Sequence, residues 1–497
     1  MASVITRAPL PSVRALLSAT LVVWLCACDQ NPTSQSQPQG TTRAILAGVD
    51  HEGAFRDADP TGTIATLGAR AFDLRNPFFQ SLGTNGRSCA SCHIIENGFG
   101  LSASYARALF ATSHGQDPLF AAVDGANCPD AAPGSGLEAH SLLINNGLIR
   151  VGITEPATPE FALTVVHDPY HCAVHSDATG TTVSVYRRPL PSTNLRFLTA
   201  VMFDGRETVN PLNSSATFAA NLQTDLAHQA VDATLGHAQA AAPPTTAQVR
   251  AIVAFELSLS TAQSSDAAAG DLMAAGARGG PAALIAQGFY PGINDPLGGN
   301  PTGAAFDPAA MTIFQRWLGI AGRGRETAAR QGVARGEQIF DTHPLLITDV
   351  KGLNDALGVA TITGTCTTCH NAPNVGDHSL PLPLDIGTSH APQYEQDPHI
   401  LAALAQLAAP DLPVYQVTCS GSNGFTTDPG RALITGKCAD LGRIKGPILR
   451  GLAARAPYFH NGAAASLAQV VAFYNARFQM GLTSQEESDL VAFLSSL

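Results

Sequence analysis

The sequence predicts a mostly α-helical fold, built from two units that each carry the same short motif and are joined by long irregular segments. Three observations lead to this prediction. The string Cys-x-x-Cys-His begins at Cys89 and again at Cys366, far apart in a chain of 497 residues. Apolar residues recur at helical spacing in several segments, whereas the alternation typical of strands is confined to short pieces. Residues 263–328 are rich in Gly, Ala and Pro, which is typical of a connection.

The repeated string is the attachment signature of a c-type haem. Its two thiols bond to the haem, and the adjoining imidazole becomes the proximal iron ligand. A redox-active dithiol does not need the following His, and a zinc site needs a second Cys-x-x-Cys close by to complete four ligands. The sequence therefore predicts two covalently bound haems. The two strings are Cys89-Ala-Ser-Cys92-His93 and Cys366-Thr-Thr-Cys369-His370.

Three helices are predicted with their boundaries. Residues 246–259 carry apolar side chains on one face, as a helix packed on a core does. Residues 466–478 place an apolar stripe along one side, with Ser466 as the N-cap. The last helix opens with a capping box formed by Ser484 and Glu487.

Strand-like alternation is limited to residues 161–166 and 181–186. An amphipathic helix is also predicted at 335–340, ahead of the second motif. The predicted organisation is a leader (1–28), a flexible tether (29–45), an N-terminal haem domain (46–262), the connection (263–328) and a C-terminal haem domain (329–497).

The N-terminus has the pattern of an export signal. Arg7 and Arg14 form its positive part, and residues 15–27 are apolar but too short to span a bilayer comfortably. The segment ends in a sequence that resembles a bacterial lipobox, with Cys28 as the lipidated residue. We therefore expect a periplasmic protein attached to a membrane through Cys28. Ordinary cleavage and release is the alternative.

Export is consistent with the remaining cysteines. Covalent haem attachment in bacteria takes place outside the cytoplasm, in a compartment that permits disulfides. Four cysteines remain once the leader and the haem motifs are set aside: Cys128, Cys172, Cys419 and Cys438. They allow three pairings, and proximity in the sequence favours Cys128–Cys172 and Cys419–Cys438.

The composition narrows the range of partners. The net charge is −11, with 39 acidic and 28 basic residues. The sequence has no basic run or basic-aromatic stripe, so nucleic acid is not a predicted partner. The acidic balance fits a basic redox protein, and it fits plain solubility equally well.

Together with the two haem strings, four further motifs resemble bacterial dihaem cytochrome c peroxidases. The resemblance implies two cytochrome c-like domains with their haems facing one interface, the N-terminal haem reacting with peroxide and the C-terminal haem transferring electrons. The same superfamily includes MauG-type enzymes, which oxidise side chains of a partner protein through high-valent iron. The motifs are Phe203-Asp-Gly-Arg206, Thr427-Asp-Pro-Gly-Arg431, Lys445-Gly-Pro-Ile-Leu-Arg450 and Ala456-Pro-Tyr-Phe-His-Asn-Gly462.

The second ligand of the C-terminal iron separates the branches of this superfamily, because axial ligands set what a haem can do. Peroxidases have a Met on the helix after the Pro-Tyr-Phe-His motif, and this chain has Tyr474 at the corresponding position. In this respect it resembles the MauG-type members. We therefore predict that His370 and Tyr474 ligate the second iron. The alternatives are Met480 as the ligand and a buried core role for Tyr474.

At the N-terminal haem, peroxidases of the family place a catalytic Glu some twenty residues after the Asp-Gly-Arg motif, and this stretch lacks one. His237 is the nearest group able to move a proton, and Gln239 is the positional equivalent of the Glu. We predict both as catalytic residues. His237 as an iron ligand and His237 as a surface residue remain alternatives.

Three further features follow from the resemblance. Arg206, Lys445 and Arg450 are predicted to pair with haem propionates, because guanidinium and ammonium groups match carboxylates. Phe203 stands where the family usually has a Trp electron relay between the haems. A calcium ion often lies between the family's domains, but its Asn ligand corresponds here to Arg188, or to Asn194 if the register shifts, so calcium is left open.

The predicted function is that of a periplasmic dihaem oxidoreductase. Hydrogen peroxide reacts at the N-terminal haem, and electrons pass through the C-terminal haem. They come from a small cytochrome c or cupredoxin, or from a protein or small-molecule substrate oxidised as MauG does. The alternative function is a non-catalytic dihaem electron carrier.

Overall fold

The structure is a computed structural model that describes residues 54–68, 72–132, 134–178, 180–209, 218–298, 300, 303–378 and 383–497. These residues belong to one compact unit. The predicted leader, the tether and Cys28 lie outside the described residues. None of the helices in the described part of the chain combines the length and the apolar character that a membrane crossing needs.

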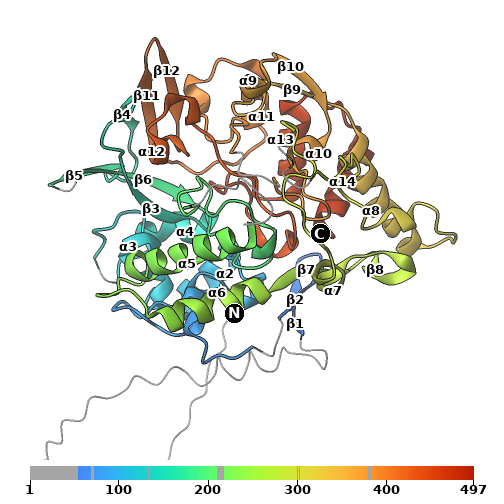
Figure 1. The fold of residues 1–497 in the computed structure, drawn as a ribbon, viewed down its shortest axis with the longest axis horizontal. Helices are drawn as coiled ribbons and strands as arrows, with labels where there is room; N and C mark the ends of the chain where they lie inside the picture. The colour runs from blue at the N-terminus through green and yellow to red at the C-terminus, as the bar shows by residue number, and fades with distance from the viewer. Residues whose placement is uncertain are drawn as a thin grey trace, which may run out of the picture. The chain divides into compact units, whose positions relative to one another are not determined.

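Helices make up 36% of the structure and strands 17%, so the prediction of a mostly α-helical fold is wrong, and the two cytochrome c-like domains are not shown. Helices α2, α4, α5 and α6 gather in one part of the molecule, and α8, α13 and α14 in another (Figure 1). The α-helices are α2 (Ala103–Ser113), α3 (Ala122–Gly125), α4 (Ser141–Asn146), α5 (Phe218–Gly236), α6 (Thr246–Ser258), α7 (Gly280–Ile285), α8 (Arg325–Thr342), α9 (Asn354–Leu357), α10 (Cys366–Cys369), α11 (Pro398–Leu404), α12 (Ala432–Thr435), α13 (Leu467–Arg477) and α14 (Ser484–Ser495).

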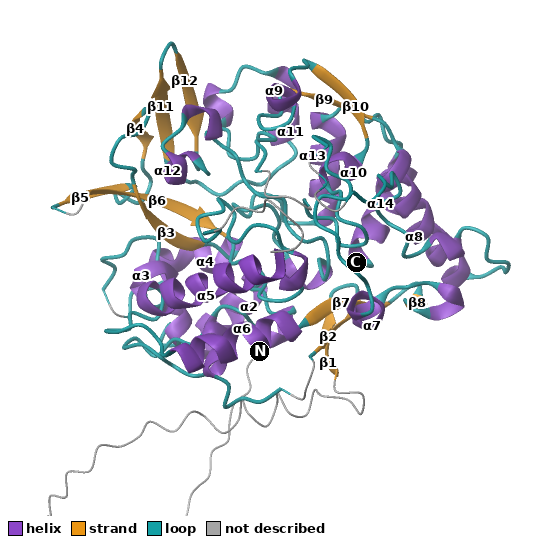
Figure 2. Cartoon of the chain, in the orientation of Figure 1, coloured by secondary structure: helices purple, strands orange, loops and turns teal. Residues whose placement is uncertain are grey.

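Four small antiparallel sheets lie among these helices (Figure 2). Their strand orders are β1-β2-β7-β8, β10-β9, β12-β11-β4 and β3-β6-β5. The strands are β1 (Ala54–Asp59), β2 (Gly62–Leu67), β3 (Ile149–Thr154), β4 (Ala162–His167), β5 (Val174–Asp177), β6 (Gly180–Arg187), β7 (Ser260–Asp266), β8 (Gly270–Asp271), β9 (Leu345–Thr348), β10 (Thr361–Gly364), β11 (Val414–Cys419) and β12 (Ser422–Thr426).

Two of the sheets join segments that are distant in the sequence. Strand β2 pairs with β7, and β4 pairs with β11, which follows it by more than two hundred residues (Figure 1). The second pairing links the two predicted haem domains, whose boundaries stay a prediction. The connection between them holds ordered elements, since β7, β8 and α7 fall within or across 263–328.

Strand β7 shows why periodicity did not reveal this sheet. Its sequence is polar, yet its first five residues are buried. The Thr261 hydroxyl lies 2.8 Å from the hydroxyl of Thr66 and 2.8 Å from that of Thr193. Buried hydroxyls that satisfy one another need no apolar alternation, so the usual strand signal is missing.

The predicted helices are present, with one correction at a helix start. The segment 246–259 forms α6, and 466–478 contains α13, whose N-cap Ser466 accepts a hydrogen bond from the backbone of Gln469. Helix α14 is capped by Thr483, which forms its capping box with Glu486. The box was predicted one residue later because Ser and Thr at adjacent positions, each followed by a Glu three residues on, carry the same local signal.

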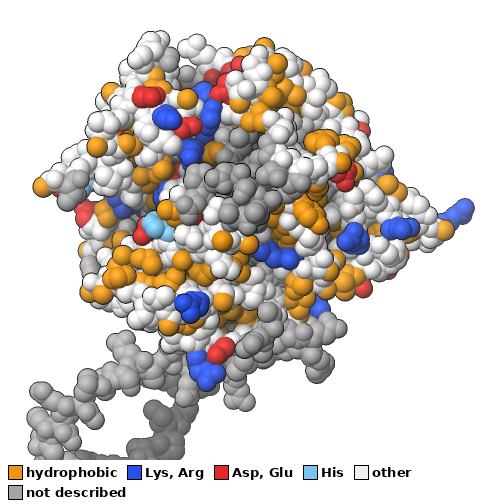
Figure 3. Space-filling model, in the orientation of Figure 1, with side chains coloured by type: hydrophobic (Ala, Val, Ile, Leu, Met, Phe, Trp, Pro, Cys, Tyr) orange, Lys and Arg blue, Asp and Glu red, His pale blue; other side chains and the backbone are white. Residues whose placement is uncertain are grey.

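The core is divided around the two motifs. Cys89 packs beside a cluster that includes Phe78, Phe79 and Phe99. Cys366 belongs to a larger cluster that includes Phe340, Phe493 and the fully buried Trp317. On the face drawn in Figure 3, the described Lys and Arg side chains are scattered among other types.

Two disulfides confirm the pairing that proximity favoured. They are Cys128–Cys172 and Cys419–Cys438. Cys128–Cys172 links two loops of the N-terminal half. Cys419–Cys438 links the end of β11 to the segment that follows α12.

Candidate functional site

The two haem motifs adopt the same local structure. The first forms a short 3-10 helix at Cys89–Ser91 and the second forms α10. A hydroxyl residue begins each helix, and its backbone N–H donates to the hydroxyl three residues later, from Ser88 to Ser91 at 3.1 Å and from Thr365 to Thr368 at 2.9 Å. The capping turn therefore presents both thiols and the following His from one tight loop.

Both His residues are oriented in the same way. The Nδ1 atom of His93 lies 3.3 Å from the carbonyl oxygen of Phe99, and that of His370 lies 2.6 Å from the carbonyl oxygen of Gly376. A carbonyl partner makes Nδ1 the protonated nitrogen and leaves Nε2 as the lone-pair donor. Burial lowers the pKa of His93 to about 4 and also lowers that of His370. Both imidazoles are therefore neutral, which is the form that binds iron.

The four motif cysteines are not joined in disulfides. Burial raises the pKa of the Cys92, Cys366 and Cys369 thiols to about 12, and that of Cys89 further. These thiols are consequently neutral and shielded, unlike a reactive thiolate pair in a redox enzyme.

An apolar cavity of about 230 Å³ adjoins the second motif. Cys366, Cys369 and His370 form part of its wall, and Tyr474 lines it from α13. The rings of His370 and Tyr474 have centroids 6.3 Å apart and planes at 73°. Burial raises the pKa of the Tyr474 phenol above its ordinary value. The predicted ligand pair is thus brought together, although Met480 lines the same cavity.

Two adjoining cavities of about 120 and 70 Å³ surround His93. Cys89 and Cys92 line the larger one, together with His237. Gln229 lines both cavities. Gln229 lies on α5, and His237 directly follows the last residue of that helix, with a backbone N–H that still donates to the Ala233 carbonyl at 2.9 Å.

His237 is held by a buried ion pair. Its Nδ1 atom hydrogen-bonds to one carboxylate oxygen of Asp124, and the other oxygen of Asp124 accepts from Arg87. Burial raises the pKa of Asp124, but Arg87 and His237 outweigh that effect and hold it below its ordinary value. The Asp124 carboxylate therefore fixes the His237 tautomer with Nε2 unprotonated, as a proton-transfer group requires. Gln239 is exposed and lines neither cavity; its side chain accepts from Asn85.

The cavities of the two motifs share one wall. Leu190, Pro191, Lys445, Ile448 and Arg455 line both the large cavity beside His370 and the smaller one beside His93. Haems bound at the two motifs would therefore both lie against these shared residues.

The shared wall carries buried positive charge. Lys445 is 5% exposed; among the described residues its ammonium group donates to the Gly446 carbonyl at 3.4 Å and is attracted by the buried carboxyl group of Asp377. Arg455 is 7% exposed with an unpaired Nε, and burial lowers its pKa to about 9. Cations this deep require anions. Haem propionates supply such anions, so the residues present fit two haems.

Arg450 and Arg206, the other two predicted propionate partners, differ in whether the protein already pairs their charge. Arg450 is buried with Nε and Nη2 unpaired, which also suits an anionic group, but it lines none of the three cavities. Arg206 already pairs with Asp204 at 3.0 Å and approaches Glu207 at 3.7 Å. Its charge is therefore balanced within the protein.

Neither residue considered for calcium fits that ion. The Arg188 guanidinium is buried and donates to the backbone carbonyls of Asn146 at 3.2 Å, Arg455 at 2.7 Å and Leu101. The Asn194 side chain is bound on both sides to the backbone of Thr261. The three backbone carbonyl oxygens that meet beside Arg188 thus surround its guanidinium group.

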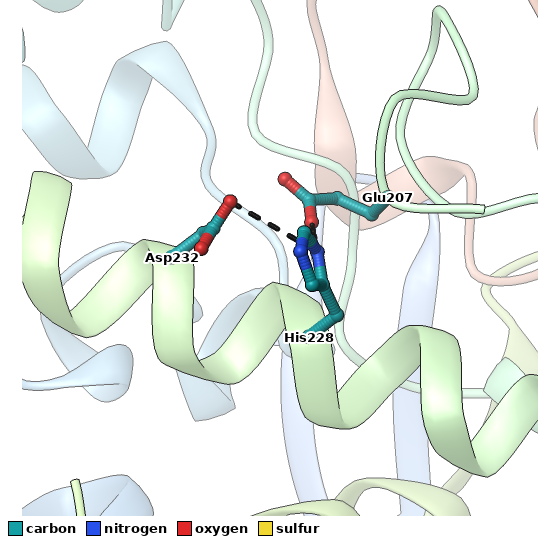
Figure 4. Close-up of side chains that lie close together, drawn as sticks. All are labelled: Glu207, His228 and Asp232. Atoms are coloured by element: carbon teal, nitrogen blue, oxygen red, sulfur yellow. Dashed lines mark hydrogen bonds and ion pairs between the residues drawn. The ribbon is translucent and has the colours of Figure 1, made fainter. Parts of the chain in front are cut away.

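A group of three possible metal donors lies on the outer side of α5. Figure 4 shows His228 between Glu207 and Asp232. The Nδ1 atom of His228 is 2.7 Å from Glu207 and 3.9 Å from Asp232, and the bond to Glu207 raises the pKa of His228. Because Arg206 also approaches Glu207, these groups form an ion-pair network whose charges are matched without a metal.

Sequence reasoning missed Gln229, Asp124, Glu256 and Arg455. A signal for Gln229 was available in the sequence, because it lies eight residues before His237, a spacing of about two helical turns. Glu256 occupies a position on α6 that is spaced like the buried Ile252 and Val253. Asp124 and Arg455 carry no local signal, since segments distant in the sequence decide their burial.

Comparisons with known proteins agree with the motifs. No family model matches the chain. Over 145 residues it is 34% identical to cytochrome-c peroxidase IdrP1 of Denitromonas iodatirespirans, a match that covers 27% of this chain and 36% of the relative. It is 32% identical over 151 residues to IdrP2 of the same organism, covering 29% and 38%. The chain thus spans little more than a third of these relatives' length.

A solved structure, of a MauG-like protein associated with microbial copper homeostasis, aligns with 85% of this chain and 87% of its own. The identity is 16% and the TM-score is 0.31, which is too low to compare the two folds. The curated relatives confirm the resemblance to bacterial cytochrome c peroxidases that the motifs predicted.

Proposed function

We propose that this protein is a dihaem c-type oxidoreductase that reduces hydrogen peroxide. One haem is held by Cys89, Cys92 and His93, and electrons reach it from a second haem held by the motif at Cys366 with His370 and Tyr474 as axial ligands. We further propose that the protein is exported to the periplasm and attached to a membrane through Cys28. The names of the curated relatives support peroxide as the substrate.

The observation that carries this proposal is the wall shared by the two cavities. It contains two buried cations: Lys445, which the buried carboxyl group of Asp377 attracts, and Arg455, whose Nε has no hydrogen-bond partner among the described residues. Cations in this position would pair with the propionates of a haem bound at either motif. Electrons would then pass between the two centres across this wall, without the Trp that Phe203 replaces.

The two centres differ in what stands opposite the proximal imidazole. At the second motif, the phenol of Tyr474 faces the ring of His370. Around His93 the cavity instead contains Gln229 and His237. A haem at each motif supplies the redox chemistry: two electrons and two protons convert peroxide into two water molecules. His237 moves protons, and Asp124 keeps its imidazole in the required tautomer.

The source of the electrons is a finer part of the proposal. A small cytochrome c or a cupredoxin donates electrons in a peroxidase cycle, whereas a MauG-like cycle takes them from a protein or small-molecule substrate. Tyr474 favours the MauG-like cycle, because a phenolate is a hard anionic donor that stabilises oxidised iron.

Spectroscopy of the purified holoprotein tests the proposal. We expect two haems per chain, one of them with a high-spin ferric signal that stoichiometric hydrogen peroxide changes. Replacing His93 by Gly should abolish that response and leave the second haem's spectrum in place. Two low-spin haems that respond to neither peroxide nor cyanide would refute the proposal and show an electron carrier instead.

A further inference from the structure

Glu256 is a buried acid, and one of its carboxyl oxygens has no hydrogen-bond partner in the described part of the chain. It lies near the end of α6 and is 4% exposed. That oxygen is Oε2. Nearly all buried carboxyl groups in proteins are hydrogen-bonded or paired with a cation, so this one needs an explanation.

The surroundings of Glu256 point to a ligand. Glu256 and Gln229 both line each of the two cavities beside His93, from neighbouring helices α6 and α5. The charged or titratable groups that line the same cavities are Arg87, Cys89, Cys92, His93, His237, Lys445 and Arg455. The described residues show no ion pair between Glu256 and the three cations of this set.

Burial explains the protonation state of the Glu256 carboxyl group. Moving a carboxylate into an apolar site without a partner costs far more than moving the neutral acid. Desolvation accordingly raises the pKa of Glu256 to about 8. At neutral pH the side chain is therefore a carboxylic acid, with a proton to donate.

We propose that Glu256 is the inner proton donor of the His93 cavity, in a pathway whose outer group is His237. This inference rests on the proposed reduction of peroxide. When the O–O bond breaks, Glu256 gives its proton to the departing hydroxide, which leaves as water. The other oxygen keeps the second proton of the peroxide, accepts two electrons and takes one more proton from solvent through His237, which makes the second water. The electrons come from the two haems. The carboxylate that remains is reprotonated from solvent.

The difference in exposure assigns the two roles. The His237 side chain is 38% exposed and exchanges protons with water directly. Glu256 has no such access, so its proton arrives through the cavity past Gln229, whose amide lines the same space. A buried acid fed by a surface imidazole keeps bulk water out of the reacting volume.

The test is Glu256→Gln, which keeps the shape and the neutral charge but removes the acidic proton. We expect the rate of the peroxide reaction to fall by about 10²–10⁴-fold, the usual contribution of a proton-transfer group. The haem content and the ferric spectrum should stay unchanged. A band of a protonated carboxyl should disappear from the infrared spectrum of the resting holoprotein. Half-buried Glu96, which lines none of the cavities, provides the control Glu96→Gln, and it should change neither measurement.

The outcomes separate this inference from the proposed function. If the wild-type protein does not react with peroxide, the proposed function fails. If the wild type reacts and Glu256→Gln reacts equally fast, or keeps the infrared band, the role of Glu256 is refuted. Should Glu256→Gln fail to bind haem, Glu256→Asp takes its place. The shorter acid should slow the reaction and shift the band, and a wild-type rate with an unshifted band would overturn the inference.

Discussion

Tyr474 carries the distinction between the two branches of the superfamily at the scale of a single residue. Its ring faces that of His370, and the side chain comes from a helix whose cap and apolar stripe the sequence shows plainly. We expect Tyr474→Phe to convert the signal of one ferric haem, recorded by electron paramagnetic resonance, into a new species. Tyr458 lines the same cavity, and its hydroxyl donates to the Leu452 carbonyl, so Tyr458→Phe is the matched control. Identical signals from Tyr474→Phe and the wild type would assign the second ligand elsewhere, with Met480→Leu as the next variant.

A second residue-scale prediction concerns acid stability. Burial raises the pKa of Asp204, but Arg187 and Arg206 outweigh it and lower the pKa to about 2. A folded-state pKa below the unfolded value stabilises the protein above pH 4, and this stability is lost as the pH falls from 4 to 2. The loss should be roughly 2.5 kcal/mol, since each pKa unit is worth about 1.4 kcal/mol. Urea unfolding between pH 6 and 2 measures it. Asp204→Asn should be less stable at pH 6 and should lack this part of the pH dependence.

At the scale of elements, α14 offers a direct check of the corrected helix start. Thr483 caps the helix: its hydroxyl accepts from the backbone of Glu486, and the Glu486 carboxylate accepts from Thr483. Thr483→Ala should destabilise the protein by about 1 kcal/mol, measured as a shift of the urea midpoint, because it removes an N-cap. Ser484→Ala is the control and should lower the free energy of unfolding much less than Thr483→Ala does. Equal losses in the two variants would restore the start predicted from the sequence.

At the scale of the whole molecule, Arg188 connects segments that the sequence keeps far apart. Its guanidinium donates hydrogen bonds to the backbone carbonyls of Leu101, Asn146 and Arg455. Its own backbone N–H donates to the backbone carbonyl of His460 at 2.7 Å. A chelator such as EGTA should therefore leave the Tm of the holoprotein unchanged, and elemental analysis should find no stoichiometric calcium. Arg188→Ala leaves three buried carbonyl groups without this hydrogen-bond donor. It should lower the free energy of unfolding by roughly 3 kcal/mol or more. A drop in Tm with EGTA that added calcium reverses would contradict this role.

The local part of the site could be predicted from the sequence. The two thiols and the imidazole of each motif, the caps of α13 and α14 to within one residue, and both disulfides depend on residues close together in the chain. The position of His237 beside His93 was also expected, because it follows a motif at a characteristic interval. Gln239, chosen by the same counting, lies outside the cavity. His237 directly follows α5 and its backbone still bonds to that helix, whereas Gln239 lies two residues further on, where its φ of 53° turns the chain away.

What the sequence by itself determined is the pair of Cys-x-x-Cys-His motifs, each ending in an imidazole, and these motifs predict two covalently bound haems. The tertiary structure decided that β2 pairs with β7 and β4 with β11, and that Lys445 and Arg455 line two cavities. It also decided that Glu256 is buried, with an oxygen that no described residue hydrogen-bonds. The physical reason is the distance along the sequence over which each interaction acts. Bond formation and helix capping depend on neighbours within a few residues, whereas burial depends on segments hundreds of residues away, and only burial turns an ordinary lysine, arginine or glutamate into a group that requires a partner.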